Sequence, residues 1–226
     1  MAMQFIESSV VGVRSSVLTL TRRESPMRFR LFPMVHVGER SFYEKVTARL
    51  RSCAIIVAEG SPMGSAPMQE RMSRIRFDDL VDQNIALDLD ALAIPVFWEQ
   101  TPRPPESRTE RLTSTAVDSA GAVAMRLLGR YGDPLRMPSL DEADDHDDRW
   151  ADGRVDRWLR DRIVDRRDDA LNRRLTSLHE EHHERPFTVA VVYGAGHMPA
   201  VVEHLRGRFR YRVKEAEWLT VAGAPR

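Results

Sequence analysis

The feature of this sequence that most constrains its fold is a continuous apolar run, FTVAVVY at Phe187–Tyr193, followed directly by Gly194-Ala195-Gly196-His197. A run without polar alternation is typical of a strand buried on both faces, as in a parallel sheet covered by helices. Small residues after the run let the backbone turn sharply. Histidine is a common metal ligand and proton carrier near neutral pH. The sequence therefore predicts a buried strand that presents His197 at its end.

Other segments of the chain have the β-branched or aromatic content of strands. One more run, Arg208–Val213, alternates polar and apolar residues as an edge strand does. The segments with strand composition are Val10–Leu20, Met27–Val35, Ala54–Ala58 and Ile94–Trp98. The apolar tail Trp218–Val221 and the run Arg208–Val213 leave two arrangements open, since they can pair within the sheet or across a homodimer.

Helical patterns lie between these strands. Ser41 is expected to cap a helix that carries Phe42, Val46 and Leu50 on one face. Further helices are expected at Val117–Arg130, from Val155 to about Glu181, and at Met198–Leu205. Strands that alternate with helices predict an α/β fold: a single domain over residues 1–226, with its core at about 27–213 and a central mostly parallel (mixed-edge) β-sheet flanked by helices.

The composition is that of a soluble globular protein. The 34 Lys and Arg residues balance 34 Asp and Glu residues, which gives no sign of nucleic-acid binding. No stretch approaches the roughly 18–20 apolar residues of a membrane span, and the first residues lack the pattern of a signal peptide. Cys53 is the only cysteine, so it forms no internal disulfide and is expected to be a small buried residue. We expect a cytoplasmic protein with neither nucleic-acid nor membrane partners.

Two irregular stretches interrupt the pattern: the proline-rich Thr101–Ser107 and the acidic Asp141–Asp148. The acidic stretch could bind a hard cation, but it lacks the glycine-punctuated spacing of a calcium loop, so a solvated loop is the better interpretation. Functional loops often cover a cleft, and both stretches are candidates for that role.

Four strands end in polar residues that suit a shared site. Ligands of open α/β sheets bind beyond the carboxyl ends of the strands, so the residues that follow each strand are candidates. They are His36 after Met27–Val35, Glu59 after Ala54–Ala58, Glu99 after Ile94–Trp98, and His197 after Phe187–Tyr193. Two histidines and two carboxylates at one edge of the sheet predict a common site.

A fifth candidate comes from the long helix. Arg167 lies on its apolar stripe, together with Ile163, Leu171, Leu175 and Leu178. An isolated buried charge is costly, so this arginine must pair with a carboxylate or reach a polar cleft. Asp168 lies at the border of the stripe. The alternative is that Arg167 extends its head to the surface or forms a purely structural ion pair, and a cleft role is the interpretation that we favour.

The ordered set of these motifs resembles the TraB/PrgY (Tiki, GumN) group, within the superfamily that includes the erythromycin esterases and the ChaN-like proteins. In that group a GxxH motif follows the first core strand, an acidic residue follows the next, an Arg-Asp or Arg-Asn pair lies on a late helix, and a second GxxH closes the set. The matching segments are Val57-Ala58-Glu59-Gly60, Arg167-Asp168-Asp169-Ala170-Leu171 and Gly194-Ala195-Gly196-His197, with Glu99 after the middle strand. The resemblance covers about Met27 to Val213.

The first motif departs from the family pattern. It is Pro33-Met34-Val35-His36, with proline where glycine is usual. Proline fixes φ and lacks an N–H donor, so the local backbone is expected to differ there. The histidine is retained, and a ligand role for His36 stays open.

The resemblance implies a metal-dependent hydrolase that acts on peptide or ester bonds, with a peptide or small molecule as substrate. In this interpretation His36, Glu59 and His197 hold a manganese, cobalt or zinc ion and its water. The superfamily also offers a metal-free alternative, in which histidine and glutamate act directly as acid and base.

Further polar residues receive roles from the same resemblance. Glu99 is a possible additional ligand or general base. Arg167 would stabilise negative charge that develops on a carbonyl oxygen, and Asp168 would orient it.

A second motif competes with this set. His179-Glu180-Glu181-His182-His183 satisfies the zincin pattern HExxH, and Glu203 could supply a third ligand. The motif lies at a helix end with Pro186 close behind, a core strand follows it, and its neighbours are charged. We therefore interpret it as a surface histidine cluster.

Two other classes of function remain open. One is a non-catalytic peptide- or haem-binding regulatory protein on the same fold, with Tyr43 or a histidine as axial ligand to haem. The other is a structural interaction module whose polar strand ends are incidental.

Overall fold

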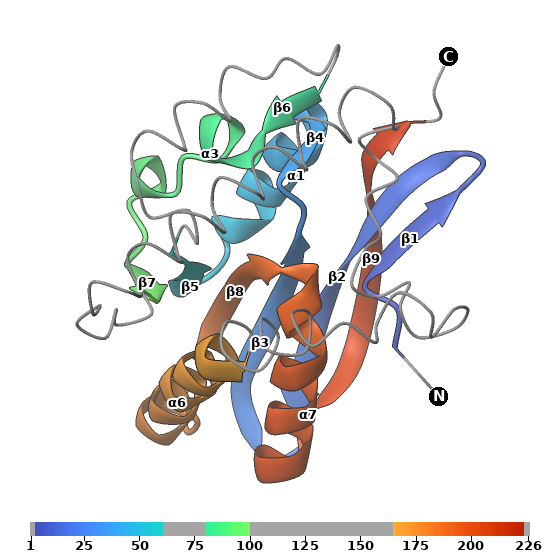
Figure 1. Cartoon of the computed structure of the whole chain (residues 1–226). Coiled ribbons are helices and arrows are strands. Elements are labelled where there is room, and N and C mark those ends of the chain that lie inside the picture. Colours follow the sequence, from blue (N-terminus) through green and yellow to red (C-terminus); the bar gives the residue numbers. More distant parts are fainter. Residues whose placement is uncertain (1–2, 61–79, 100–164, 224–226) are drawn as a thin grey trace, which may run out of the picture.

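A computed structural model of the chain describes residues 3–60, 80–99 and 165–223 (Figure 1). Several sequence predictions fall outside these residues: the helix Val117–Arg130, the first part of the helix from Val155 (with Ile163), and the stretches Thr101–Ser107 and Asp141–Asp148.

The described residues form a seven-stranded mixed sheet, and the expected α/β class is confirmed. Its parallel part has the order β3 (Ser25–Met34), β8 (Thr188–Gly194), β5 (Ile55–Glu59) and β7 (Val96–Glu99). Its antiparallel part contains β1 (Ile6–Ser9), β2 (Gly12–Arg22) and β9 (Arg212–Gly223). A separate two-stranded sheet pairs β4 (Val37–Glu39) with β6 (Leu80–Asp82).

The long strand β2 has three partners. It pairs with β9 from Gly12 to Thr21, so β1 and β3 share its other edge, β1 beside 12–15 and β3 beside 18–22. The start of β2 needs glycine, because Gly12 has φ 123° and a Cβ there would lie 2.2 Å from the Ala222 carbonyl oxygen.

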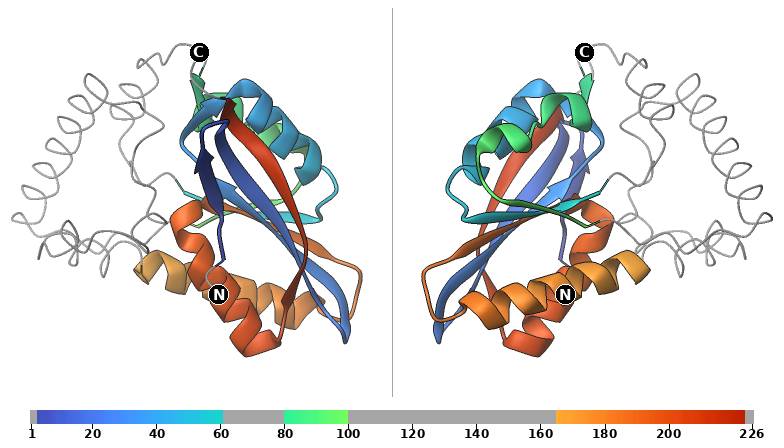
Figure 2. Two further views of the ribbon diagram at one scale, coloured as in Figure 1. Left: turned by 90° about the vertical axis from the view of Figure 1, so that its right-hand side faces the viewer. Right: turned by 90° about the vertical axis from the view of Figure 1, so that its left-hand side faces the viewer.

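Helices cover both faces of the sheet. Helix α1 (Arg40–Leu50) packs on the face that carries Ile56 and Ala58, while α6 (Asp165–His182) and α7 (Met198–Phe209) pack on the face that carries Val57 and Val191. This alternation is the expected consequence of the two-residue period of a strand. In both views of Figure 2, α6 and α7 lie together at one end of the sheet and α1 lies toward the other. A short helix α3 (Gln83–Ala86) and two 3-10 turns, η1 (Asp90–Leu92) and η5 (Ala195–His197), complete the described elements.

Most strand predictions are confirmed, but the edge strand at Arg208–Val213 is wrong. Helix α7 continues to Phe209, Arg210 closes it in the left-handed region with φ 62°, and β9 begins at Arg212. Phe209 at the end of α7 packs against the core, and Tyr211 in the connection that follows is buried. Two apolar contacts two residues apart give the same sequence alternation as an edge strand. The tail Trp218–Val221 belongs to β9 and pairs within the sheet, with β2.

The cap of α1 also differs from the expectation. The helix begins at Arg40, and Ser41 lies in its first turn, where its hydroxyl donates to the Glu39 carboxylate at 3.3 Å. The helix face was predicted correctly, because Phe42, Val46 and Leu50 are all buried. Cys53 is buried as expected. In the described part of the chain, no helix is long and apolar enough to span a membrane.

Candidate functional site

Three elements bring four charged side chains together at the carboxyl edge of the parallel strands. Strand β5 ends in Glu59, β8 runs through Gly194 into the turn η5 that presents His197, and the first turn of α6 supplies Arg167 and Asp168. Glu59 lies two residues after Val57, so it points to the face on which α6 packs. We refer to Glu59, Arg167, Asp168 and His197 as the edge network.

Hydrogen bonds and ion pairs link all four side chains of the edge network. Arg167 lies 2.7 Å from Glu59 Oε1 and also donates to the Gly60 carbonyl oxygen at 2.9 Å. His197 Nδ1 lies 2.6 Å from Asp168 Oδ1, and its Nε2 lies 3.6 Å from Glu59 Oε1. The Gly194 N–H donates to Glu59 Oε2 at 2.8 Å. Every member of the edge network therefore contacts at least one group of opposite charge.

These side chains are mostly shielded from solvent. The exposed fraction is 9% for Arg167, 11% for Glu59, 10% for His197 and 14% for Asp168. The ring of Tyr193 packs edge-on against His197, with ring centres 5.6 Å apart. Charges held in such a place interact more strongly than a solvated surface pair does.

The environment moves the pKa values of two members in opposite directions. Burial opposes the charge of Glu59, but contacts with His197, Arg167 and the Gly194 N–H outweigh it and lower the pKa of Glu59 to about 2. Burial also opposes the charge of His197, but Asp168 and Glu59 raise the pKa of His197 to about 9. At neutral pH the edge network therefore contains two carboxylates, one guanidinium and one imidazolium, and these charges cancel.

The backbone of Gly194 is part of this arrangement. A Cβ at Gly194 would lie 3.2 Å from Glu59 Oε2 and 3.8 Å from His197 Cδ2. With any larger residue at position 194, the side chain would keep the backbone N–H farther from the Glu59 carboxylate. The sequence predicted a turn here but did not reveal the hydrogen bond to Glu59; the only signal was a small residue directly after a buried strand.

The contacts of Arg167 agree with the expectation, whereas those of Asp168 differ from it. Arg167 lies on the buried stripe with Leu171, Leu175 and Leu178, as predicted. Asp168, which was expected to orient Arg167, instead contacts Nδ1 of His197. Asp168 therefore orients the imidazole, a partner that helix phase alone could not identify.

His36 is not part of the edge network. It follows β3 at the expected edge, but its side chain is exposed, and the chain turns at once into β4. Its carbonyl oxygen accepts a hydrogen bond from the Gln83 N–H at 2.8 Å. The backbone of His36 lies where the strand-end rule predicts, whereas the direction of its side chain does not follow from that rule.

Glu99 and Pro33 both occupy regular strand positions. Glu99 is the last residue of β7 and lies in register with Glu59 in the adjacent strand. Pro33 lies within β3, in register with Tyr193, and its carbonyl oxygen accepts the Ser15 hydroxyl at 2.6 Å. The last β2–β3 pair is Leu18 with Leu31, so Pro33 comes where that ladder has ended. Proline is accommodated here without interrupting the strand.

The described residues do not complete a metal site. His197 and Glu59 are the only two of the expected ligands that lie together, and Glu59 Oε1 already pairs with Arg167. No group of three or more His, Cys, Asp or Glu side chains in the described ranges could hold a metal ion. Zinc and similar ions need at least three protein ligands in a catalytic site, so this donor set does not fit one.

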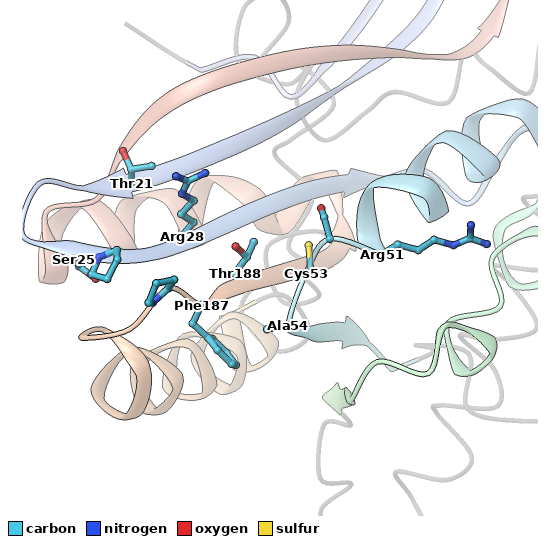
Figure 3. A pocket seen from close by; sticks show the side chains of 11 residues that line it. Thr21, Ser25, Arg28, Arg51, Cys53, Ala54, Phe187 and Thr188 are labelled. Atoms are coloured by element: carbon cyan, nitrogen blue, oxygen red, sulfur yellow. The ribbon is translucent and has the colours of Figure 1, made fainter.

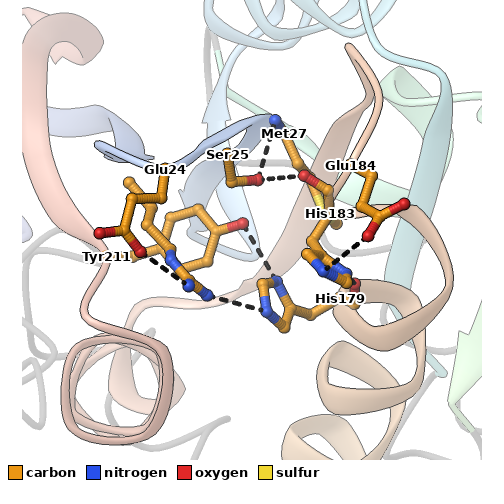
Figure 4. Close-up of polar contacts among 8 residues, drawn as sticks. Glu24, Ser25, Met27, His179, His183, Glu184 and Tyr211 are labelled. Carbon is orange, nitrogen blue, oxygen red and sulfur yellow. Dashed lines mark hydrogen bonds and ion pairs between the residues drawn. The ribbon is translucent and has the colours of Figure 1, made fainter.

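The HExxH segment forms a packed cluster, and the expectation of a surface histidine cluster is wrong for His179 and His182, which are both buried. Arginine can only donate, so the Arg22 guanidinium donates to His179 Nε2 at 3.4 Å, and His179 Nδ1–H then donates to the Tyr211 hydroxyl at 3.2 Å (Figure 4). The His183 Nδ1–H donates to the His179 carbonyl oxygen at 3.1 Å.

These contacts disagree with a zincin role for the segment. Both ring nitrogens of His179 are engaged, and Glu203, the nominated third ligand, is exposed. The histidines of this segment serve the packing between α6, the β2–β3 hairpin and the connection from α7 to β9. The tyrosine considered for haem is equally engaged, since Tyr43 is fully buried and its hydroxyl donates to the Val35 carbonyl oxygen at 2.9 Å.

Comparisons with known proteins give no further identification: no protein-family model, curated protein or solved structure matches the chain. The resemblance to the TraB/PrgY group therefore stays a prediction that depends on the motifs alone.

Proposed function

We propose that this protein is a hydrolase of peptide or ester bonds, and that the edge network carries the reaction. The observation that supports the proposal most is the convergence of Glu59, Arg167, Asp168 and His197, from separate elements, with two pKa values shifted in opposite directions. Strongly shifted groups at the carboxyl edge of a parallel sheet are typical of catalytic sites.

His197 is the general acid in this proposal. Asp168 holds its Nδ1, which leaves the Nε2–H on the side of Glu59. With a pKa of about 9, the imidazolium is present at neutral pH and can give a proton to the leaving oxygen or nitrogen as the scissile bond breaks.

Glu59 is the proposed general base. It accepts a proton from the water that attacks the carbonyl carbon. While His197, Arg167 and the Gly194 N–H all contact Glu59, the pKa of this carboxyl stays at about 2 and the base is weak. A substrate that draws Arg167 to its carbonyl oxygen would both stabilise the oxyanion and raise the pKa of Glu59. The proton returns from Glu59 to His197, whose Nε2 is 3.6 Å away.

This chemistry corresponds to the metal-free alternative and not to the metal-dependent one. The described residues supply two of the ligands that a metal would need, and no step above requires an ion. The proposal includes a cytoplasmic location, which is compatible with a chain whose only cysteine, Cys53, is buried and unpaired.

Hydrolysis can be tested with chromogenic carboxylic esters and quenched fluorescent peptides at neutral pH, before and after removal of metals by a chelator. We expect metal-stripped protein to keep its activity. His197→Gln and Glu59→Gln should each lower the rate by about 100-fold or more, the usual contribution of a general acid or base.

His36→Gln is the matched control, because it changes a histidine at the same edge that lies outside the edge network. Its rate should equal that of the wild type. Activity that depends on added manganese, cobalt or zinc and is lost in His36→Gln would instead support the metal triad of the family resemblance. Peptide binding without turnover would support the regulatory alternative and contradict the proposal.

A further inference from the structure

A second feature lies at the opposite edge of the sheet, where the parallel strands begin. A hollow of about 580 Å³ opens there, between the β2–β3 hairpin and the end of α1 (Figure 3). Its volume lies in the range of roughly 300–1,000 Å³ that is usual for small-molecule sites. The residues that line it are Thr21, Ser25, Pro26, Arg28, Arg51, Ser52, Cys53, Ala54, Pro186, Phe187 and Thr188.

The sheet register gathers positive charge at this hollow. Thr21 pairs with Arg28 on one side and with Arg212 on the other, and Arg28 pairs with Thr188. Paired residues project to the same face, so these side chains form one row across four strands. The row lies on the same face of the sheet as α1. It is close to the start of the parallel strands, where α1 has already ended and does not cover it. Arg51 marks the end of α1, at the other side of the hollow.

This positive charge is not neutralised within the described residues. None of the lining residues is acidic, and neither Arg28 nor Arg51 forms an ion pair with a described residue. The nearest acidic position in the register is Glu215, which pairs with Thr19 in the next row. In a chain with equal numbers of acidic and basic residues, arginines gathered without carboxylates point to an external anion.

Hydroxyl donors lie beside the arginine. Figure 3 shows Arg28 on β3 between Thr21 of β2 and Thr188 of β8. No hydrogen bond to a described residue occupies the hydroxyl of Thr21 or Thr188, whereas Ser25 and Ser52 are engaged with the carbonyl oxygens of His183 and Arg49. An arginine fork flanked by two available hydroxyls is a suitable donor set for a tetrahedral oxyanion.

We propose that this hollow is a binding site for a phosphate monoester, separate from the edge network. The phosphate contacts Arg28, Thr21 and Thr188, and the organic part extends over Ala54 toward Arg51. The site uses residues that have no part in the proposed hydrolysis, so either function can fail without the other.

Calorimetric titration with phenyl phosphate, at constant ionic strength in chloride, tests the proposal, with phenol as the matched ligand without phosphate. Phenyl phosphate should bind with a dissociation constant of about 1 mM or lower, and inorganic phosphate should compete with it. Arg28→Gln should weaken binding about tenfold or more, because it removes a charge-assisted contact. Thr188→Val should weaken it by a smaller factor while keeping the side-chain shape.

Arg23→Gln is the control, because it removes the same charge from the β2–β3 turn without lining the hollow, and it should leave binding unchanged. All four proteins must show the same melting temperature to within a few degrees before they are compared. Equal heats for phenyl phosphate and phenol, or equal losses in Arg28→Gln and Arg23→Gln, would overturn the proposal.

Discussion

Among single residues, Arg167 supplies the guanidinium that pairs with the buried Glu59 carboxylate. Arg167→Met leaves the Glu59 carboxylate buried without its guanidinium partner, and we expect a loss of about 3 kcal/mol in the free energy of unfolding. Denaturant unfolding at neutral pH measures this loss. The exposed Arg173 of the same helix is the control, and Arg173→Met should change stability by less than about 0.5 kcal/mol. Similar losses in both variants would show that the Arg167–Glu59 pair is not a stabilising feature.

Gly194 tests whether a backbone contact positions Glu59. In Gly194→Ala, the new methyl group would crowd Glu59 Oε2, and the carboxylate would move away from the N–H and from His197. We expect the pKa of His197 to fall from its value of about 9, as followed by NMR titration of the imidazole. Gly207→Ala is the control, since nothing lies within 4 Å of a Cβ at that helical position. An unchanged titration of His197 in Gly194→Ala would refute the positioning role.

At the scale of elements, the sequence predicts buried structure better than exposed structure. Strands β5 and β8 follow from continuous apolar runs, and the stripe through Leu171, Leu175 and Leu178 indicates the buried face of α6. Strand β9 was predicted only in part, at Arg212–Val213 and in the tail Trp218–Val221, because most of its first seven residues are exposed and polar. Its position depends on pairing with β2, at the other end of the chain, and a local pattern contains no information about such a partner.

The candidate site shows the same division. Strand ends predicted the backbone positions of Glu59 and His197, and helix phase predicted that Arg167 is buried. His36 was placed correctly along the chain but not in the edge network, because the direction of a loop side chain depends on the turn that follows. Here that turn leads into β4, and it leaves the imidazole in solvent.

The junction of β2 and β9 gives an element-scale prediction. Gly12→Ala puts a Cβ in a left-handed conformation and 2.2 Å from the Ala222 carbonyl oxygen, so the strand ends must separate. We expect a loss of about 2 kcal/mol, measured by thermal unfolding. Gly223→Ala, at the paired position, meets only Glu39 Oε1 at 3.6 Å and should cost less than about 1 kcal/mol. Equal losses would show that the conformation of Gly12 is not the cause.

For the whole molecule, the shifted groups set the dependence of stability on pH. The folded pKa of His197, about 9, lies above its ordinary value of 6.5, so its contribution is complete below pH 6.5 and is lost as the pH rises through 9. Glu59 has a folded pKa of about 2 against 4.5, and its contribution is complete above pH 4.5 and is lost as the pH falls through 2.

His179 acts in the opposite direction from His197. Burial, with the nearby His183 and Arg22, lowers the pKa of His179 to about 4, so its unfavourable protonation reduces stability as the pH falls from 6.5 toward 4. We therefore expect maximum stability near pH 6.5, measured as the free energy of unfolding across the pH range. His197→Gln should flatten the alkaline side and His179→Gln the acidic side. A profile that neither substitution changes would contradict this assignment.

The pairing of β2 with β9 has a consequence for biosynthesis. Ribosomes deliver the chain from its N-terminal end, so β2 and β3 are available long before residues 212–223 have been made. Throughout that interval one edge of β2 has no partner and offers unpaired N–H and carbonyl groups to any extended chain nearby. Nascent copies on the same messenger are therefore exposed to strand exchange with one another. That exposure ends when β9 has been synthesised and pairs with β2.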